Sequence, residues 1–359
     1  MATQVDRRLR VGIIGSGGIA RAQHIPNYKR HPRAEVVAVA DVDERAARLA
    51  ADQFDIPNVY ADYNELLARD DVDAVSVATP PAMHHDPVVA AAKAGKHILC
   101  EKPMALTVAQ CDEMVGAARA AGVRLMVGYQ PRFSASWQAV RRLIDEGAIG
   151  TPHGLNIISV GKAAHPRAWF FDPAIAGGGI LMDWGTYTTY QMQYFLGPVE
   201  SVYALGTTNL HEFTCRDGSV ARDIQVEDTV AATLRFANGA FGVWYSTWAS
   251  PGHDGHFEID GSDGIISLGR GGAAVSVLSS RFEDPDYLRG WRALDIVDMP
   301  ALELYRLRIY HFVDSLLDDT PFAVTGEDGR QAIAVTEALY TSMREGGPVT
   351  VSPPLTGGA

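Results

Sequence analysis

Two short stretches of the chain carry acids and bases at spacings that suit proton transfer. The first is Glu101-Lys102-Pro103, which follows an apolar run and sets a carboxylate beside an amine. In an open α/β sheet, ligands bind beyond the carboxyl ends of the strands, so a charged tripeptide at a strand end points to chemistry. Proline after Lys102 fixes a turn, for which a cis peptide bond is one option. The alternative is a solvated strand end that happens to be charged.

The second stretch begins with three glycines at 177–179 and continues as a helical pattern that Gly197-Pro198 ends. Asp183 and Tyr187 are four residues apart, so they share one face of the expected helix. An acid and a phenol side by side can bind and activate a hydroxyl or a carbonyl group. Alternatively, Tyr187 packs in the core and Asp183 serves the first turn, near the positive end of the helix dipole.

A glycine-rich turn lies near the N-terminus, between an apolar run at 9–14 and a helical pattern that extends to about Arg30. Its sequence is Gly15-Ser16-Gly17-Gly18-Ile19-Ala20. Strand, glycine turn and helix in that order are the context of a dinucleotide fingerprint, in which Gly15 permits the tight turn and Gly17 lets the backbone approach a pyrophosphate. The phosphates would then lie at the helix N-terminus. A similar turn in another α/β protein is the alternative.

A carboxylate follows the second expected strand and indicates which dinucleotide binds. Residues 34–40 are apolar apart from Glu35, and the run ends at Asp41. A carboxylate at this position accepts hydrogen bonds from the adenosine ribose hydroxyls and repels a 2′-phosphate, which favours NAD over NADP. Arg45 lies close in sequence and softens that preference, so NADP stays the alternative cofactor.

The elements that position these residues form two patterns. Over residues 1–128, apolar strands at 9–14, 34–40, 74–78, 97–101 and 124–128 alternate with helices at 43–54, 64–69, 86–94 and 107–121, which predicts an α/β fold with a doubly wound parallel sheet. Over 129–359, a helix to about 146 precedes strands at 153–160, 200–206, 225–237, 240–248, 257–260 and 265–268. Asn238-Gly239 and Asp263-Gly264 favour hairpins, hence a mostly antiparallel sheet. Helices at 302–317 and 328–344 close this second expected domain.

Composition narrows the class of protein. A chain of 359 residues with 47% hydrophobic residues suits two domains of an ordinary globular protein. A net charge of −12 argues against nucleic acid as a partner. Three widely spaced cysteines suggest a reducing compartment, and we expect no secretion signal, no membrane segment and a cytoplasmic location.

His253 and His256 fall in an expected loop without a third ligand, so no metal is predicted.

Taken together, the sequence resembles the glucose–fructose oxidoreductase / inositol dehydrogenase / rhizopine-catabolism (Gfo/Idh/MocA) family of NAD(P)-dependent oxidoreductases over nearly its full length. The resemblance rests on the glycine-rich turn, Asp41, Ala78-Thr79-Pro80, His84, the 94–97 and 101–103 runs, Gly128-Tyr129 with Arg132-Phe133, and 177–179 through Asp183. It implies a Rossmann domain followed by an α/β domain with a large open sheet, which often forms the interface of a homo-oligomer such as a dimer or tetramer. It also implies sugar, cyclitol or related polyol substrates.

The resemblance also implies positions for the site. Cofactor contacts are expected from Gly15, Gly17, Gly18, Ile19, Asp41, Arg45, Thr79, Pro80, His84, Glu101 and Lys102. His84 has a competing interpretation as a structural hydrogen-bonding residue. Family members typically carry histidine where this chain has Tyr187, and often an acid where it has Tyr190. Tyrosine at the first of these positions resembles the glucose–fructose oxidoreductase and dimeric dihydrodiol dehydrogenase branches, whose tyrosine is proposed as the acid/base.

These residues predict a mechanism for alcohol oxidation, which needs a hydride acceptor and a base. Free lysine and tyrosine, with pKa values of ~10.4 and ~10, are too weakly acidic to act as bases at neutral pH unless a nearby positive charge lowers those values. We predict that Lys102 and Tyr187 share proton transfer while Asp183 orients the substrate or Tyr187. Substrate contacts are expected from Lys102, Tyr129, Arg132, Trp169, Asp183 and Tyr187, with Lys162 and His165 in segments that should also face the cleft. The alternatives are a keto-sugar or dihydrodiol-type reductase, and a non-catalytic dinucleotide-binding regulator.

Overall fold

The computed structural model describes residues 8–165, 167–269, 274–281 and 290–355. The chain divides into two compact units. The N-terminal unit runs to Phe133 and includes Pro300–Arg330, and the C-terminal unit comprises Ser134–Met299 and the chain from Gln331 onward. The domain boundary expected between residues 128 and 129 stays a prediction. The helix expected at 302–317, however, packs with the N-terminal unit and not with the second domain to which we assigned it.

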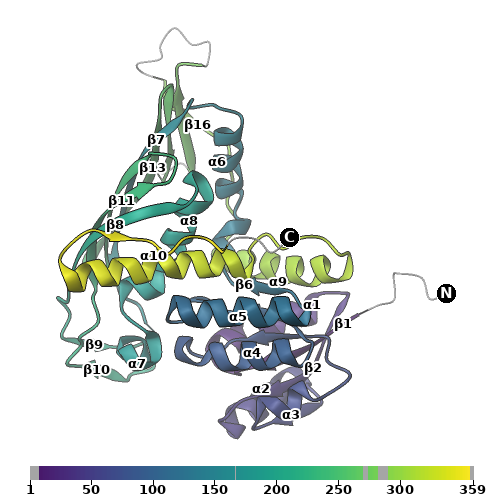
Figure 1. The fold of residues 1–359 in the computed structure, drawn as a ribbon. Coiled ribbons are helices and arrows are strands. Elements are labelled where there is room, and N and C mark those ends of the chain that lie inside the picture. Colours follow the sequence, from purple (N-terminus) through teal and green to yellow (C-terminus); the bar gives the residue numbers. More distant parts are fainter. Residues whose placement is uncertain (1–7, 166, 270–273, 282–289, 356–359) are drawn as a thin grey trace. The chain divides into compact units, whose positions relative to one another are not determined.

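The N-terminal unit is built on six parallel strands in the order β3-β2-β1-β4-β5-β6 (Figure 1). The strands are β1 Leu9–Ile14, β2 Ala34–Ala40, β3 Asn58–Tyr60, β4 Ala74–Val77, β5 His97–Cys100 and β6 Leu125–Val127. The strand order changes direction at β1 and β4, which confirms the predicted doubly wound parallel sheet. Only β3 was not predicted, because its three residues are half-buried and form no apolar run.

Helices cover both faces of this sheet. They are α1 Ile25–Arg30, α2 Glu44–Phe54, α3 Tyr63–Leu67, α4 His85–Lys93, α5 Val108–Ala121 and α9 Ala301–Leu317, with short turns of helix at η3 Pro81–Met83 and η4 Gln130–Phe133. Helix α1 continues a π-helical turn, η2 Ala20–His24. Helices α4 and α5 pack side by side, and α9 packs against α1, η2 and β1 (Figure 1). Apolar residues of α9, namely Ile309, Phe312 and Val313, join the core formed with β1 and α1.

The C-terminal unit contains a nine-stranded sheet in the order β16-β15-β14-β13-β7-β12-β11-β8-β17. Its strands are β7 Pro152–Lys162, β8 Val199–Thr207, β11 Thr229–Phe236, β12 Phe241–Thr247, β13 Ala249–Gly261, β14 Gly264–Leu268, β15 Val275–Ser279, β16 Arg292–Ala293 and β17 Val349–Thr350. Neighbouring strands are antiparallel except β7 and β12, which confirms the predicted mostly antiparallel sheet. Asn238-Gly239 and Asp263-Gly264 connect hairpins as expected. His253 and His256 lie in β13, so the expected loop there is wrong.

Helices and a small hairpin complete this unit. They are α6 Ala135–Asp145, η5 Ala168–Phe171, α7 Pro173–Ala176, η6 Leu181–Gly185, α8 Thr186–Leu196 and the hairpin β9 Glu212–Thr214 with β10 Val220–Arg222. Helix α10 Gly326–Glu345 begins in the N-terminal unit and ends in this one. In β12, Trp244 is buried, whereas Phe241, Val243 and Tyr245 point to the exposed face. Within the described ranges, no helix combines the length and apolar character needed to cross a bilayer.

Candidate active site

The glycine-rich turn follows β1 and leads into the helix that contains η2. Gly15 has a φ of 88°, and a Cβ there would lie 2.8 Å from the Thr79 backbone nitrogen, so only glycine fits. Gly17 and Gly18 differ, because a Cβ on either would meet nothing within 4 Å. The turn therefore packs closely against the end of β4 through Gly15 and leaves open space beside the next two glycines. That space adjoins a helix N-terminus, where a pyrophosphate is favoured.

Asp41 lies at the end of β2 and is held by the same turn. Its Oδ2 atom accepts hydrogen bonds from the Ser16 backbone N–H at 2.7 Å and the Ser16 hydroxyl at 2.8 Å, while Oδ1 accepts from the Asp43 N–H at 2.9 Å. Three donors therefore fix the carboxylate beside the glycine-rich turn, and its contact with a ribose stays a prediction. Arg45 lies in the first turn of α2, and it is exposed. The sequence identified Asp41 but not its tie to Ser16.

His84 connects two of the loops at this sheet edge. The ring is fully buried, with Nε2 at 2.8 Å from the Thr79 carbonyl oxygen and Nδ1 at 2.7 Å from that of Pro103. Burial lowers the pKa of His84, while the carbonyl groups of Pro103 and Thr79 act in the opposite direction. Its observed role is to tie the turn after β4 to the turn after β5. Contacts of Thr79, Pro80 and His84 with a cofactor stay predictions.

The Glu101-Lys102-Pro103 turn follows β5 at the same edge of the sheet. The peptide bond between Lys102 and Pro103 is cis, the option that the sequence raised. Glu101 is buried, and its Oε2 atom accepts a hydrogen bond of 3.1 Å from the Lys102 backbone N–H. Lys102 itself is half-buried. Glu101 thus acts on the backbone of the turn that carries Lys102.

A buried charged network, which sequence reasoning missed, surrounds Glu101. Its Oε1 atom lies 2.7 Å from His24 Nε2 and 2.8 Å from Arg308 Nη2, and His24 Nδ1 lies 2.7 Å from the Ser76 hydroxyl. Burial alone would raise the pKa of Glu101, but the Arg308 guanidinium and the His24 ring hold it well below its usual range. Burial also lowers the pKa of His24. The hydrogen bonds fit a His24 ring that donates from Nε2 to Glu101 and accepts a hydrogen bond from the Ser76 hydroxyl at Nδ1.

The second candidate stretch lies in the C-terminal unit. Asp183 belongs to the π-helical turn η6, and Tyr187 lies in the first turn of α8, which confirms the helix but adds a π turn to it. π turns within helices often occur at functional sites. Both side chains are half-buried. The Asp183 Oδ2 atom lies 3.8 Å from Nδ1 of His165, whose ring is surrounded by Phe170, Phe171, Phe213 and Trp248.

Two of the three glycines before this helix, Gly178 and Gly179, make close contacts with the chain's own residues. A Cβ on Gly179 would lie 1.8 Å from the Glu227 carbonyl oxygen, and one on Gly178 would lie 1.9 Å from the Tyr340 hydroxyl. The buried Glu227 carboxylate accepts hydrogen bonds from the N–H groups of Gly179 and Leu181 and, at 2.8 Å, from the Tyr340 hydroxyl. Burial raises the pKa of Glu227, although these donors oppose it. The Glu227 carboxyl group therefore caps this helix N-terminus, and sequence reasoning missed it.

The remaining expected substrate contacts lie in different surroundings. Tyr129 follows β6 and is fully buried. Arg132 in η4 is half-buried, and its charge acts on His311 and Asp328 of the same unit. Trp169 stacks on the Phe170 ring at 3.9 Å between centroids. Lys162 is exposed and His165 buried. Substrate binding by Tyr129, Arg132 and Trp169 stays a prediction.

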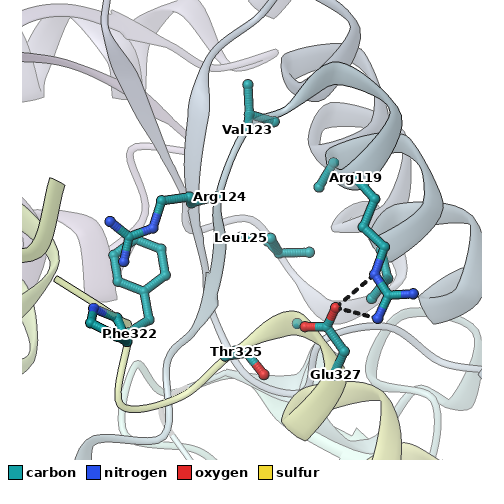
Figure 2. A pocket seen from close by; sticks show the side chains of 11 residues that line it. Arg119, Val123, Arg124, Leu125, Phe322, Thr325 and Glu327 are labelled. Carbon is teal, nitrogen blue, oxygen red and sulfur yellow. Dashed lines mark hydrogen bonds and ion pairs between the residues drawn. The ribbon is translucent and has the colours of Figure 1, made fainter. Parts of the chain in front are cut away.

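A cavity of about 280 Å³ in the N-terminal unit lies away from these loops. It is lined by α5, the start of β6 and the chain from Pro321 to Glu327. Figure 2 shows the Arg124 guanidinium against the Phe322 ring, at 4.0 Å from its centroid, and the ion pair of Arg119 with Glu327. The start of β6 belongs to the sheet edge opposite the carboxyl ends of the strands. This cavity is therefore not the predicted cofactor site.

Family models match both parts of the chain. Residues 9–129 match an oxidoreductase family model described as an NAD-binding Rossmann fold, and residues 137–267 match the GFO/IDH/MocA C-terminal domain. Myo-inositol 2-dehydrogenase of Thermotoga maritima is 32% identical over 339 residues, which cover 94% of this chain and 97% of that protein. The chain belongs to the GFO/IDH/MocA family. It is an NAD(P)-dependent oxidoreductase of CH–OH groups, and its N-terminal region is an NAD-binding Rossmann domain.

Further members of the GFO/IDH/MocA family are similar over most of the chain. 1,5-Anhydro-D-fructose reductase of Ensifer adhaerens is 28% identical over 340 residues, covering 94% of this chain and 97% of that protein. The structure of a levoglucosan dehydrogenase in complex with NADH has a TM-score of 0.84 at 26% identity, with 96% of this chain and all of that chain covered. The open space beside Gly17 and Gly18 and the anchored Asp41 are compatible with NAD. Contacts of the glycine turn with its pyrophosphate and of Asp41 with its ribose stay predictions.

Proposed function

We propose that this enzyme transfers a hydride between NAD and a hydroxyl or keto carbon of a sugar, cyclitol or related polyol. Three relatives support that substrate class, since their names specify myo-inositol, 1,5-anhydro-D-fructose and levoglucosan as substrates. The observation that carries the proposal is the position of Lys102, in a turn held by Glu101 at the sheet edge that also carries Gly15 and Asp41. Bound NAD supplies the hydride acceptor or donor.

Within this proposal, Lys102 and Tyr187 share the proton transfer. In oxidation, the pair takes the hydroxyl proton of the alcohol, and in reduction it returns a proton to the carbonyl oxygen. Two titrating groups that act on one substrate oxygen have apparent pKa values that belong to the pair, so neither is assigned as the single base. Asp183 precedes Tyr187 by one turn and orients the substrate or the phenol. The proposal requires the N-terminal and C-terminal units to bring Lys102 and Tyr187 to the same substrate oxygen.

Substitution of the proposed pair tests this function. Lys102→Met should remove turnover on a panel of sugars, cyclitols and polyols while leaving the NADH dissociation constant unchanged in a fluorescence titration. Tyr187→Phe should lower kcat more than about tenfold, or roughly 1.4 kcal/mol. Tyr190→Phe is the matched control, because Tyr190 is buried three residues further along α8 and stacks on Trp137 and Tyr194. Normal turnover of Lys102→Met would refute the scheme, and a smaller effect of Tyr187→Phe would remove tyrosine from it.

The same panel, assayed with NAD and with NADP, tests cofactor choice and direction. We expect NAD to be preferred, because the Asp41 carboxylate would repel a 2′-phosphate. Asp41→Ser should shift the ratio of kcat/KM values towards NADP, with exposed Arg45 available to the phosphate. A wild-type preference for NADP would contradict the role of Asp41. Turnover in the reducing direction alone would indicate a keto-sugar or dihydrodiol-type reductase, and NAD binding without turnover would indicate a regulator.

We further propose that the exposed face of the C-terminal sheet pairs with a second copy of the chain in a homo-oligomer. Large apolar side chains lie on this face of β8 and β12, the two strands that flank β11: Leu205 is 58% exposed, Phe241 64%, Val243 46% and Tyr245 41%. In register, Leu205 and Tyr245 flank Ala231 of β11. Contiguous exposed apolar patches mark interaction sites. Phe241→Asp should reduce the molar mass measured by light scattering, and a monomeric wild type would contradict the proposal.

A further inference from the structure

Arg308 is a buried cation that reaches the Glu101-Lys102-Pro103 turn from far along the chain. Its side chain is fully buried on α9, with Nη2 2.8 Å from Glu101 Oε1. Its Nη1 atom donates a hydrogen bond of 3.0 Å to the Gly128 carbonyl oxygen. One guanidinium therefore joins the carboxylate that follows β5 to the backbone that follows β6. Neither contact requires a substrate or a cofactor to be present.

The surroundings fit a planar guanidinium closely. A Cβ on Gly128 would lie 2.5 Å from Arg308 Nη1 and 3.2 Å from Glu101 Oε2, so glycine at this position makes room for the arginine. The Tyr305 ring, one turn earlier on α9, lies 5.0 Å from the guanidinium carbon. A lysine ammonium is a single point charge and cannot reproduce the two divergent hydrogen bonds of the arginine. The site is therefore specific for arginine.

We propose that Arg308 is a positioning residue for the oxidoreductase reaction: it fixes Glu101, and Glu101 fixes the backbone N–H of Lys102. The inference rests on the proton-transfer role proposed for Lys102. In this arrangement, Arg308 touches neither substrate nor cofactor. Its loss leaves Lys102 in the chain but releases the turn that carries it.

The charges around Glu101 determine what the loss of Arg308 does. The titratable groups that face or adjoin Glu101 are His24 and Tyr28 from η2 and α1, His84 from the start of α4, Arg308 from α9, and Cys100 and Lys102 in its own segment. Burial opposes ionisation of Glu101, and the guanidinium is the strongest factor that favours it. Without Arg308, the carboxyl pKa rises, so Glu101 binds a proton at higher pH than in the wild type. Protonation weakens its hold on the Lys102 N–H.

Kinetics of Arg308→Met test the proposal. At neutral pH, kcat should fall at least tenfold while the NADH dissociation constant stays within about threefold of the wild type. The kcat/KM profile should acquire an acidic limb, on which activity falls as pH falls, and the limb should disappear in the double variant Arg308→Met with Glu101→Gln. Arg306→Met is the matched control, because Arg306 lies on the same helix, is 36% exposed and pairs with Glu303. Wild-type kcat and an unchanged pH profile in Arg308→Met would overturn the proposal, even with a lowered Tm.

A second variant serves if Arg308→Met does not fold. Arg308→Lys retains the positive charge, so we expect no acidic limb, but it loses one of the two hydrogen bonds and should keep a reduced kcat. Equal kcat values for Arg308→Lys and the wild type would contradict a role for the guanidinium geometry.

An NMR measurement separates this proposal from the proposed function. The lysines of the chain are Lys29, Lys93, Lys96, Lys102 and Lys162, so reductive ¹³C-methylation gives a simple spectrum in which Lys102→Met assigns one signal. Arg308→Met should move the Lys102 signal, and Arg306→Met should leave it in place. An unmoved signal would overturn the positioning role. A wild type that turns over no polyol would instead refute the proposed function without affecting this measurement.

Discussion

Two buried glutamates, one in each unit, support the two candidate catalytic segments in different ways. Glu101 in the N-terminal unit is paired with the Arg308 guanidinium and the His24 ring, which hold its pKa well below the usual range despite burial. Glu227 in the C-terminal unit receives hydrogen bonds from backbone N–H groups and the Tyr340 hydroxyl, and burial raises its pKa. Both carboxylates hold backbone, of the Lys102 turn in one case and of the helix with Asp183 in the other.

The difference shows what fixes the charge of a buried acid. Neutral donors satisfy the oxygens of Glu227 but do not fully offset the loss of solvation, whereas a guanidinium buried with Glu101 does. Pairing with a guanidinium, as at Glu101, leaves a buried cation that is stable only while its carboxylate partner is present. A buried ion pair is therefore easily damaged by the loss of one member, even though the intact pair adds little net stability.

The largest expected effect is the contrast between Glu101→Gln and Glu227→Gln at neutral pH. Glu101→Gln leaves the buried Arg308 without its carboxylate, which costs about 3–5 kcal/mol when one member of a buried pair is removed. Glu227→Gln removes only part of a set of neutral hydrogen bonds and should cost about 1 kcal/mol. Urea unfolding of the two variants measures both values. Similar losses in the two variants would remove the distinction between the sites.

The second expected effect concerns Gly179, whose backbone packs against that of Glu227. Gly179→Ala would bring a Cβ to 1.8 Å from the Glu227 carbonyl oxygen, and a backbone atom cannot move aside as a flexible side chain does. Forced overpacking of this kind costs about 1–3 kcal/mol. Gly116→Ala in α5 is the control, because its Cβ would meet nothing within 4 Å and alanine favours a helix interior by about 1 kcal/mol. If Gly179→Ala left the free energy of unfolding unchanged, the helix start would not be held by Glu227.

The third expected effect is a pH dependence of opposite sign for the two glutamates. The folded-state pKa of Glu101 is lowered, so its contribution to stability is present above about pH 4.3, the ordinary glutamate value, and is lost as pH falls below it. The folded-state pKa of Glu227 is raised, so its contribution falls as pH rises from about 4.3 towards the raised value. A tenfold difference between the proton dissociation constants of the folded and unfolded states corresponds to about 1.4 kcal/mol of stability.

Thermal unfolding of the wild type, Glu101→Gln and Glu227→Gln over a pH series measures these slopes. The stability of the wild type relative to Glu101→Gln should decrease towards acid. The stability of the wild type relative to Glu227→Gln should decrease as pH rises above about 4.3, the ordinary pKa of a glutamate. Slopes of the same sign would contradict the assignment of one of the two carboxylates.

The backbone of the N-terminal unit was largely predictable, because it follows from local patterns. The apolar run at 34–40 coincides with β2, and Asp43 caps α2 by accepting hydrogen bonds from the Arg45 and Ala46 N–H groups. Short strands such as β3, β16 and β17 were missed because two or three residues carry no periodicity. These strands form through pairing with neighbours that are distant in sequence, which no local window reveals.

The site was predictable only where spacing determines contact. Gly15 and Asp41 follow strands whose order places them at one sheet edge, and both lie there. The partner of Glu101 required tertiary contact with α9. Its signal was nonetheless present, because Arg308 lies at helical spacing from Tyr305 and Phe312 on an otherwise apolar face. An arginine on such a face indicates a buried partner. Gly178 and Gly179 permit the close approach that we expected of this glycine run, but the groups that approach are Tyr340 and Glu227.

The smallest expected effect is that of Tyr340→Phe, which removes one neutral donor from Glu227. The hydroxyl donates at 2.8 Å, and burial together with Glu227 raises the pKa of Tyr340 well above its ordinary value, so the phenol stays protonated as a donor. One such hydrogen bond contributes about 0.5–1.5 kcal/mol. Because the donor also favours the ionised carboxylate, its loss should raise the pKa of Glu227 further and extend the pH-dependent loss of stability to higher pH. A urea series at two pH values measures both changes. An unchanged pH dependence in Tyr340→Phe would mean that the backbone N–H groups alone set the charge of Glu227, and that the contrast with Glu101 lies entirely in Arg308 and His24.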